Sequence, residues 1–424
     1  MREVRQQGRR RPADGIWLAA SFAMLALSGV GMNLIIAMGY GSAALGVFNL
    51  TFAVYIFASQ LAVLGMQYAA LYYVSIHADN EDGKYAAGAS LICGAFCSCL
   101  AAFAVYGARE ALAVLMHTPE LAGSLALAAA GLLFFSANKI FLNILNAHNQ
   151  IRQYALGTFA RYGGLVLSVL ALTLFACPTW SLAAALPCAE LCAAGWLYLH
   201  ARRHVAWRMP LSTLTVWVRR VSSYGARASA VGVVAELNTR VDILILGCFA
   251  SNAVVGLYSF VALLAEGLAQ LPMLGRIYND PIIARLWVSQ HLEELRRLVR
   301  HTRLLGWASM TSICALSYLL YEPVLAFLPR GAEYMAATPV FGILLCGVAV
   351  SAGYVPLSGM LQQTGCPGWQ SLQVVCVFLV NVAGNLALVP FWGIYGAAIG
   401  LALSQIGMIF ILRILVRRAL CFRL

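Results

Sequence analysis

The sequence predicts an all-α polytopic membrane protein with about twelve transmembrane helices in two six-helix bundles. Of its 424 residues, 62% are hydrophobic and only 10% are charged, whereas a soluble domain carries about 25% charged residues. The apolar residues form long continuous runs, which favour spanning helices over the alternating strands of a barrel. Too few polar side chains remain to cover a soluble surface, so a soluble enzyme is excluded.

The apolar runs set the positions of the expected spans. About 20 mostly apolar residues are needed to cross about 30 Å of hydrocarbon as a helix. Runs of this kind occupy 16–38, 44–74, 86–107, 122–145, 154–176, 181–200, 222–248, 253–275, 302–328, 336–361, 369–389 and 393–414. The second and tenth runs are long enough to tilt in the bilayer or to extend beyond it.

The distribution of Lys and Arg sets the orientation. Only Arg109 and Arg330 fall in predicted outer loops, and only Lys139, Arg161 and Arg240 fall within spans, out of 28 Lys and Arg residues. Basic residues gather in cytoplasmic loops of membrane proteins, so we expect both termini to be cytoplasmic. This asymmetry also accounts for the net charge of +12 without a nucleic-acid partner.

An internal repeat relates the second predicted span to the eighth. An offset of 210 residues aligns Ala43 with Ala253, Gly46 with Gly256, Gln60-Leu61 with Gln270-Leu271, Leu64-Gly65 with Leu274-Gly275, and Tyr68 with Tyr278. Six spans are an even number, so the two halves share one orientation and a substrate path is expected between them. The predicted domains are an N-terminal lobe (1–205), a cytoplasmic linker (206–221) and a C-terminal lobe (222–424).

Two cations in predicted spans indicate a site for an anion. Lys139 lies about two turns from the cytoplasmic end of the fourth span, with Asn143 one turn further on, and Arg161 lies about two turns into the fifth. An ionisable residue within a span is a functional hypothesis by default. Two unpaired cations at this depth suit a phosphate entering from the cytoplasm. The alternative is that both side chains extend to the membrane interface.

Carboxylates in the sixth to eighth spans are candidates for ion coupling. Glu236 and Arg240 are spaced i,i+4 and can pair on one helix face, while Asp242 points elsewhere. Either this pair only fixes helix packing, or Arg240 contacts a ligand and a carboxylate binds H⁺ or Na⁺. Glu190 and Glu266 lie near mid-membrane with no cation in sequence reach, so each is a candidate protonation site.

Motifs for enzymes and metals are absent from the sequence. There is no Ser/His/Asp set and no HExxH, and the outer loops are short. Cys188 and Cys192 have metal-ligand spacing, but no second pair joins them, so we expect no metal and no cofactor. Residues 290–300 read either as an amphipathic helix on the inner membrane surface or as a connector helix.

The last two spans carry a family resemblance. Asn385–Ala402 (NLALVPFWGIYGAAIGLA) resembles a signature of bacterial polysaccharide flippases, the O-antigen and exopolysaccharide exporters of the multidrug/oligosaccharidyl-lipid/polysaccharide (MOP) superfamily. The stretches Arg240–Gly247, Val255–Tyr258 and Leu45–Phe48 resemble the seventh, eighth and second spans of the same family. In span number, the resemblance covers essentially the whole chain.

The resemblance implies a function. It implies an inner-membrane flippase with a fold like that of the multidrug (MATE) exporters. Such a protein moves a lipid-linked oligosaccharide, on a polyprenyl pyrophosphate carrier, to the outer leaflet by alternating access. Its partners would be lipids and proteins of polysaccharide polymerisation and assembly, and we expect a monomer. Alanine at Lys139 and Arg161 should then abolish export with protein levels intact. The alternatives are a cation-coupled multidrug antiporter and, less well supported, a membrane glycosyltransferase or polymerase.

Overall fold

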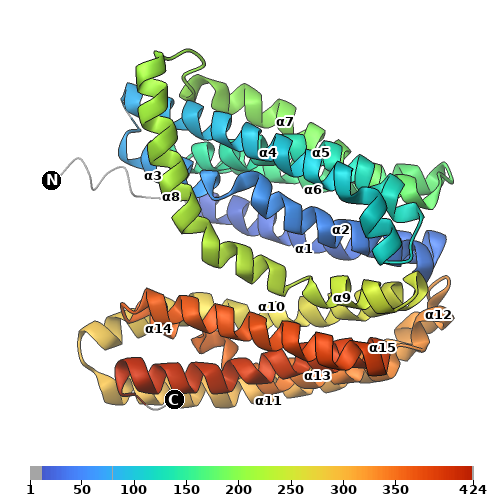
Figure 1. Ribbon diagram of the computed structural model, residues 1–424. Coiled ribbons are helices and arrows are strands. Elements are labelled where there is room, and N and C mark those ends of the chain that lie inside the picture. The colour runs from blue at the N-terminus through green and yellow to red at the C-terminus, as the bar shows by residue number, and fades with distance from the viewer. Residues whose placement is uncertain (1–11, 79, 423–424) are drawn as a thin grey trace. The chain divides into compact units, whose positions relative to one another are not determined.

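The computed structural model describes residues 12–78 and 80–422, and within these ranges every regular element is a helix (Figure 1). Contacts divide the chain into a first unit, Met1–Ile36 with Val54–Val233, and a second unit, Ala37–Ala53 with Val234–Leu424. The boundaries run through three helices: α1 (Pro12–Tyr40), α2 (Ser42–Val63) and α8 (Leu211–Asn238). Residues 206–221, the predicted linker, lie in the first unit.

The remaining elements each belong to one unit. The first unit holds α3 (Met66–Ile76), α4 (Glu81–Leu115), α5 (Glu120–Ala147), α6 (Ile151–Leu174), η1 (Thr179–Ala184), α7 (Ala185–Ala201) and η2 (Arg202–His204). The second unit holds α9 (Val241–Phe249), α10 (Asn252–Val288), α11 (Leu292–Ala326), α12 (Gly331–Met335), α13 (Thr338–Ser351), η3 (Val355–Leu357), α14 (Met360–Gln363) and α15 (Pro367–Leu420).

The predicted all-helical membrane fold is confirmed. Nine helices in the described ranges are long and apolar enough to cross a membrane, and a tenth span forms if α13 and the segment 355–363, bent by 45°, count as one. The 54-residue α15 contains two predicted spans, 369–389 and 393–414. Its backbone turns at Gly393 (φ 52°, ψ −124°), a conformation that only glycine adopts readily, and Figure 1 shows two antiparallel stretches there.

Three predicted segments differ from the structure. The predicted seventh span, 222–248, is broken, because α8 ends at Asn238 and α9 begins at Val241. The second span is broken between α2 and α3, where Leu64 and Gly65 have positive φ angles. Residues 290–300 form no separate surface helix, because α11 runs without interruption from Leu292 into the ninth span. The N-terminal arginines and Arg423, used for the orientation, lie outside the described residues.

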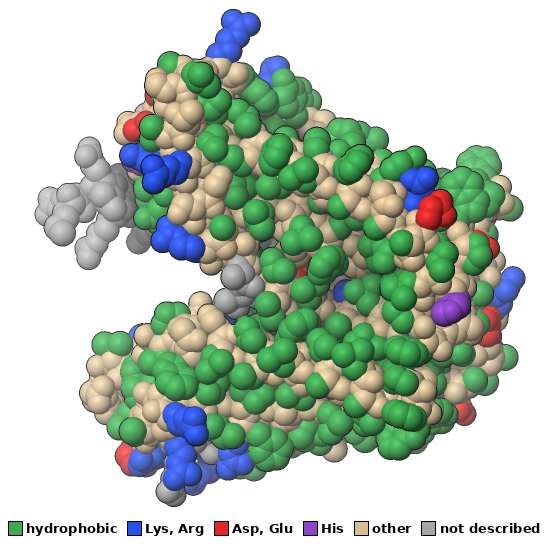
Figure 2. All heavy atoms as spheres, viewed as in Figure 1, with side chains coloured by type: hydrophobic (Ala, Val, Ile, Leu, Met, Phe, Trp, Pro, Cys, Tyr) green, Lys and Arg blue, Asp and Glu red, His purple; other side chains and the backbone are tan. Residues whose placement is uncertain are grey.

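The side chains on the outside of each unit are those expected of helices in lipid. In Figure 2 hydrophobic side chains cover most of the visible surface, and most visible charged side chains lie toward the ends of each unit. Large side chains such as Phe96 (65% exposed), Phe103 (77%) and Phe391 (83%) point outward. A soluble protein would bury such residues, whereas a bilayer solvates them.

Small residues let the helices approach closely. A Cβ atom on Gly46 would overlap the carbonyl oxygen of Asn252, and one on Gly256 would overlap that of Ser42. Helices α2 and α10 therefore cross in backbone contact within the second unit. Such contacts between small residues are typical of helix packing in membranes, where hydrophobicity alone does not hold helices together.

Candidate functional site

A buried ion pair forms the centre of the first unit. Arg161 on α6 donates from Nε to Glu190 Oε1 on α7 at 2.9 Å, and a second guanidinium nitrogen donates to the same oxygen. The hydroxyl of Tyr55 also donates to this oxygen, at 3.1 Å, and the Asn138 amide donates to Oε2 at 2.9 Å. The Glu190 side chain is 2% exposed and that of Arg161 is 11% exposed. The carboxylate is thus fully hydrogen-bonded, as a buried charge requires.

This geometry corrects two sequence predictions. Arg161 is not an unpaired cation, and Glu190 does have a cation within reach. The sequence treats the two residues separately because 29 positions lie between them, but α6 and α7 pack side by side and bring them together. The case for Glu190 as an isolated protonation site therefore loses its premise, although its role in transport stays a prediction.

Lys139 on α5 lies beside this pair and has no acidic partner among the described residues. Its Nζ is 5.6 Å from the centroid of the Phe135 ring, and Arg161 Cζ lies 4.8 Å from the same centroid. No described side chain forms a hydrogen bond or ion pair with Lys139 Nζ. Cation–π attraction partly compensates for the lost hydration of both cations. The sequence predicts no role for Phe135, although residues spaced i,i+4 on a helix, such as Phe135 and Lys139, lie on the same face.

The Asn143 side chain forms a hydrogen bond within its own helix. Its amide donates to the backbone carbonyl of Lys139 at 2.9 Å, a bond along its own helix. Such back-bonding is common for polar side chains in helices. On α5 it is Asn138, a residue not predicted from the sequence, that binds Glu190.

The second unit carries its own charged cluster at the break between α8 and α9. Arg240 lies in this break and contacts Glu266 of α10, with 3.5 Å between NH2 and Oε2. The predicted i,i+4 pair of Glu236 with Arg240 is wrong, because the helix does not continue from one residue to the other. Arg240 also lies over the Phe52 ring, at 5.7 Å from Cζ to the centroid.

Asp242 is buried next to this cluster. It lies in the first turn of α9, where the helix dipole stabilises a negative charge, and it accepts a hydrogen bond from the Tyr258 hydroxyl. Asp242 is 3% exposed, and its Oδ1 atom has no hydrogen-bond partner among the described residues. A half-satisfied buried carboxylate is costly, so this group has the properties of a site that takes up a cation or a proton.

An asparagine ladder supports the broken helix. The Asn381 amide donates to both the backbone and the side-chain oxygens of Asn238, at 3.1 and 3.0 Å. The Asn385 amide in turn donates to Asn381, at 2.9 Å for the backbone oxygen and 2.8 Å for the side-chain oxygen. These bonds partly satisfy the carbonyl groups that a helix end leaves open. Asn385 is the first residue of the motif that carries the family resemblance.

The two clusters differ in charge. The cluster of the first unit holds two cations, Lys139 and Arg161, and one carboxylate, Glu190. In the second unit, Arg240 has Glu266, Asp242 and Glu236 near it. The first set therefore suits an anion and the second suits a cation or proton. Within the described residues, no three His, Cys, Asp or Glu side chains converge as metal ligands.

Comparison with known proteins identifies the fold. A family model described as a polysaccharide biosynthesis protein matches residues 91–274. An inward-facing multidrug resistance MATE family transporter of the MOP superfamily matches with a TM-score of 0.73 and 13% identity, over 93% of this chain and 96% of that chain. The lipid II flippase MurJ, in an inward closed conformation, matches with a TM-score of 0.72 and 12% identity, over 94% of this chain and 86% of that chain.

A third structure is an MOP superfamily transporter from Pyrococcus furiosus, with a TM-score of 0.58 and 14% identity over 95% of this chain and 94% of that chain. No curated protein matches the sequence significantly. The chain is a multi-pass membrane protein with the fold of the MOP superfamily transporters. The family model, together with this fold, confirms the predicted resemblance to the polysaccharide branch of that superfamily.

Proposed function

We propose that the protein is a flippase for a lipid-linked oligosaccharide in the bacterial inner membrane. It moves the headgroup, carried on a polyprenyl pyrophosphate, from the cytoplasmic to the outer leaflet for cell-surface polysaccharide biosynthesis. The polysaccharide family model supports this proposal, because the matched region 91–274 contains both charged clusters. A solved lipid II flippase with the same fold supports it further.

The unpartnered Lys139 is the observation that carries the proposal. A buried salt bridge alone, such as Arg161 with Glu190, is as often structural as functional. Lys139 has no such explanation: it is half-buried in a predicted span, and no described carboxylate neutralises it. A pyrophosphate would supply the missing negative charge, and Arg161, which lies near the same Phe135 ring, would add to the positive potential.

The carboxylates of the second unit would couple transport to an ion. Asp242 is buried, and one of its oxygens has no hydrogen-bond partner among the described residues, so binding H⁺ there removes a buried charge. In a two-state transporter, an ion shifts the equilibrium only if it binds one state more tightly. Arg240 pairs with Glu266 and lies two residues before Asp242 in the broken segment, where a change of helix geometry would alter the surroundings of both carboxylates.

Cells that lack the protein provide the test. Lipid-linked oligosaccharide should accumulate in the cytoplasmic leaflet and be cleared when the wild-type protein is supplied. Lys139→Ala should fail to clear it at normal protein levels. Lys84→Ala is the matched control, since the Lys84 side chain is exposed and pairs with Glu81 at 2.8 Å. Clearance by Lys139→Ala equal to that of the wild type would overturn the anion-site assignment.

A cation-coupled multidrug antiporter is the second candidate. The excess of carboxylates in the second unit favours it, because a cationic drug would neutralise them, and the fold is shared with a MATE transporter. Under this alternative, the deletion strain would become sensitive to cationic dyes with no change in lipid-linked oligosaccharide. Protection would then depend on Asp242 and Glu266 and not on Lys139.

A further inference from the structure

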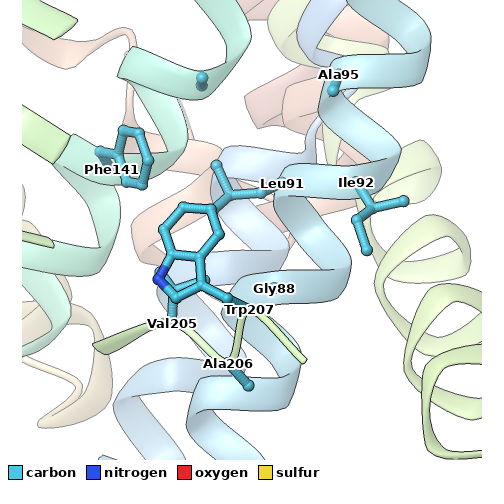
Figure 3. Close-up of a pocket in the computed structure, with 9 residues that line it drawn as sticks. Gly88, Leu91, Ile92, Ala95, Phe141, Val205, Ala206 and Trp207 are labelled. Atoms are coloured by element: carbon cyan, nitrogen blue, oxygen red, sulfur yellow. The ribbon is translucent and has the colours of Figure 1, made fainter. Parts of the chain in front are cut away.

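A groove on the first unit is lined by none of the residues of the two charged clusters. It lies between α4, α5 and the segment 205–207, and it has a volume of about 310 Å³ (Figure 3). Leu91 and Ile92 of α4 form one wall, Phe141 of α5 forms another, and the indole of Trp207 lies across it. We call it the Trp207 groove. Its size is at the lower end of the range for ligand sites.

The groove is preformed because the segment 204–207 is fixed at three points. The Ala206 N–H donates to the Lys84 carbonyl at 3.1 Å, and the Trp207 indole N–H donates to the Arg202 carbonyl at 3.1 Å. His204 Nε2 lies 2.9 Å from the Gln150 amide nitrogen. Gly88 permits this packing, because a Cβ atom there would lie 2.6 Å from the Ala206 carbonyl oxygen.

The lining of the groove accepts only an apolar ligand. Every side chain that lines it is aliphatic or aromatic, and the one polar atom among them, the indole nitrogen of Trp207, is already bonded to Arg202. Ile92 is 49% exposed and Trp207 is 57% exposed. Further along α4, outside the groove, Phe96 and Leu100 are also exposed. A long hydrocarbon chain fits such a surface, whereas a sugar or a nucleotide does not.

Exposed basic residues lie close to Trp207 in the sequence. Arg202 and Arg208 are exposed and flank Trp207 along the chain, and no described carboxylate pairs with either of them. Tryptophan at this position is typical of the membrane–water interface. Each Arg near an anionic surface strengthens lipid binding. The groove is therefore apolar, and exposed arginines neighbour the tryptophan that lines it.

We propose that the Trp207 groove binds an acyl chain of an anionic phospholipid of the surrounding bilayer, whose headgroup phosphate is held by Arg202 and Arg208. The lipid occupies a site on the outside of the first unit and is not the transported molecule. It fills the space between α4 and the segment 205–207, and so stabilises the connection from α7 to α8.

Fluorescence quenching by brominated lipids tests the proposal on the purified full-length protein in nanodiscs. The chain has nine tryptophans, so the emission of Trp207 is obtained as the difference between the wild type and Trp207→Phe. Phosphatidylglycerol and phosphatidylcholine with brominated acyl chains are compared by the mole fraction that gives the same quenching. We expect this mole fraction to be at least about fivefold lower for phosphatidylglycerol. The measurement needs no transport, so its result is independent of the proposed function.

Matched variants separate the headgroup from the acyl chain. The double variant Arg202→Gln/Arg208→Gln should lose the preference for the anionic lipid. The control is the double variant Arg219→Gln/Arg297→Gln, which removes the same charge from exposed positions elsewhere and should keep the preference. Ala95→Phe fills the groove from its exposed end and should abolish quenching of Trp207. Leu100→Phe, on the same helix but outside the groove, should leave quenching unchanged.

Four results would overturn the proposal. Equal quenching by the two lipids would show that Arg202 and Arg208 select nothing. Absence of quenching would show that no acyl chain enters, and unchanged quenching in Ala95→Phe would place the chain elsewhere. Quenching by a brominated polyprenyl phosphate but not by phosphatidylglycerol would assign the groove to the tail of the substrate.

Discussion

Gly46 and Gly256 lie against each other in the structure, although they are equivalent positions of the two sequence repeats, 210 residues apart. The contact is reciprocal, because Gly46 faces the carbonyl of Asn252 and Gly256 faces that of Ser42, and Ser42 and Asn252 are also 210 residues apart. Such exchange of partners is the property of a two-fold interface. The crossing of α2 and α10 therefore supports the internal repeat independently of sequence identity.

This crossing predicts a large effect from one methyl group. Gly256→Ala should destabilise the protein by about 2 kcal/mol or more, because the added carbon overlaps backbone and the helices must separate. Gly267→Ala, on the same helix with open space around it, should be neutral or stabilising by up to about 1 kcal/mol, as alanine favours helix. Thermal unfolding in detergent measures both. Equal stability of the two variants would show that the contact is not tight.

The pair of Arg161 and Glu190 predicts a loss of stability on truncation. Arg161→Met leaves Glu190 buried without its cation, so it should cost about 3–5 kcal/mol of unfolding free energy. Protein levels should fall, contrary to the expectation from sequence that alanine here affects export alone. Adding Glu190→Gln removes the stranded charge and should restore part of the loss. A double variant no more stable than Arg161→Met would show that the stranded carboxylate is not the cause.

Helix positions could be read from the sequence, but the partners of the charges could not. Apolar runs report burial in lipid, which depends on composition over about 20 residues. The partners of Glu190 depend on which helices touch, and Tyr55 and Arg161 lie 135 and 29 residues away. The run 222–248 contains no local signal for a helix end. The break after Asn238 is stabilised by a hydrogen bond from Asn381, which lies 143 residues further along the chain. Pairings of this kind require the fold.

His204 predicts a pH dependence of the segment that forms the Trp207 groove. Partial burial and the charges of His148, whose ring centroid lies 3.7 Å from that of His204, of Arg203 and of Lys84 lower the pKa of His204 from 6.5 to about 4. The folded protein therefore binds this proton less readily than the unfolded chain. The stabilising contribution is complete above pH 6.5 and is lost as the pH falls toward 4.

The melting temperature between pH 7 and pH 4.5 measures this contribution. The wild type should lose more stability on acidification than His204→Gln, which cannot take up the proton. His291→Gln is the control, because its ring is exposed and its variant should follow the wild type. Parallel curves for the wild type and His204→Gln would show that His204 is not the responsible group.

Asp242 predicts which carboxylate couples transport to protons, if the proposed flippase function holds. Asp242→Asn keeps the shape and can still accept the hydrogen bond from Tyr258, but it cannot exchange a proton. In proteoliposomes, the variant should still exchange lipid-linked oligosaccharide between leaflets, but an imposed pH gradient should no longer increase net transport. Differential proton binding by the two states supplies that drive, and the variant removes the difference.

The control for this prediction is Glu236→Gln. Glu236 is a half-buried carboxylate with no ion pair among the described residues, so the variant should keep the full response to the gradient. A full response in Asp242→Asn together with its loss in Glu236→Gln would transfer the coupling role to Glu236, and the unpartnered oxygen of Asp242 would then reflect packing alone.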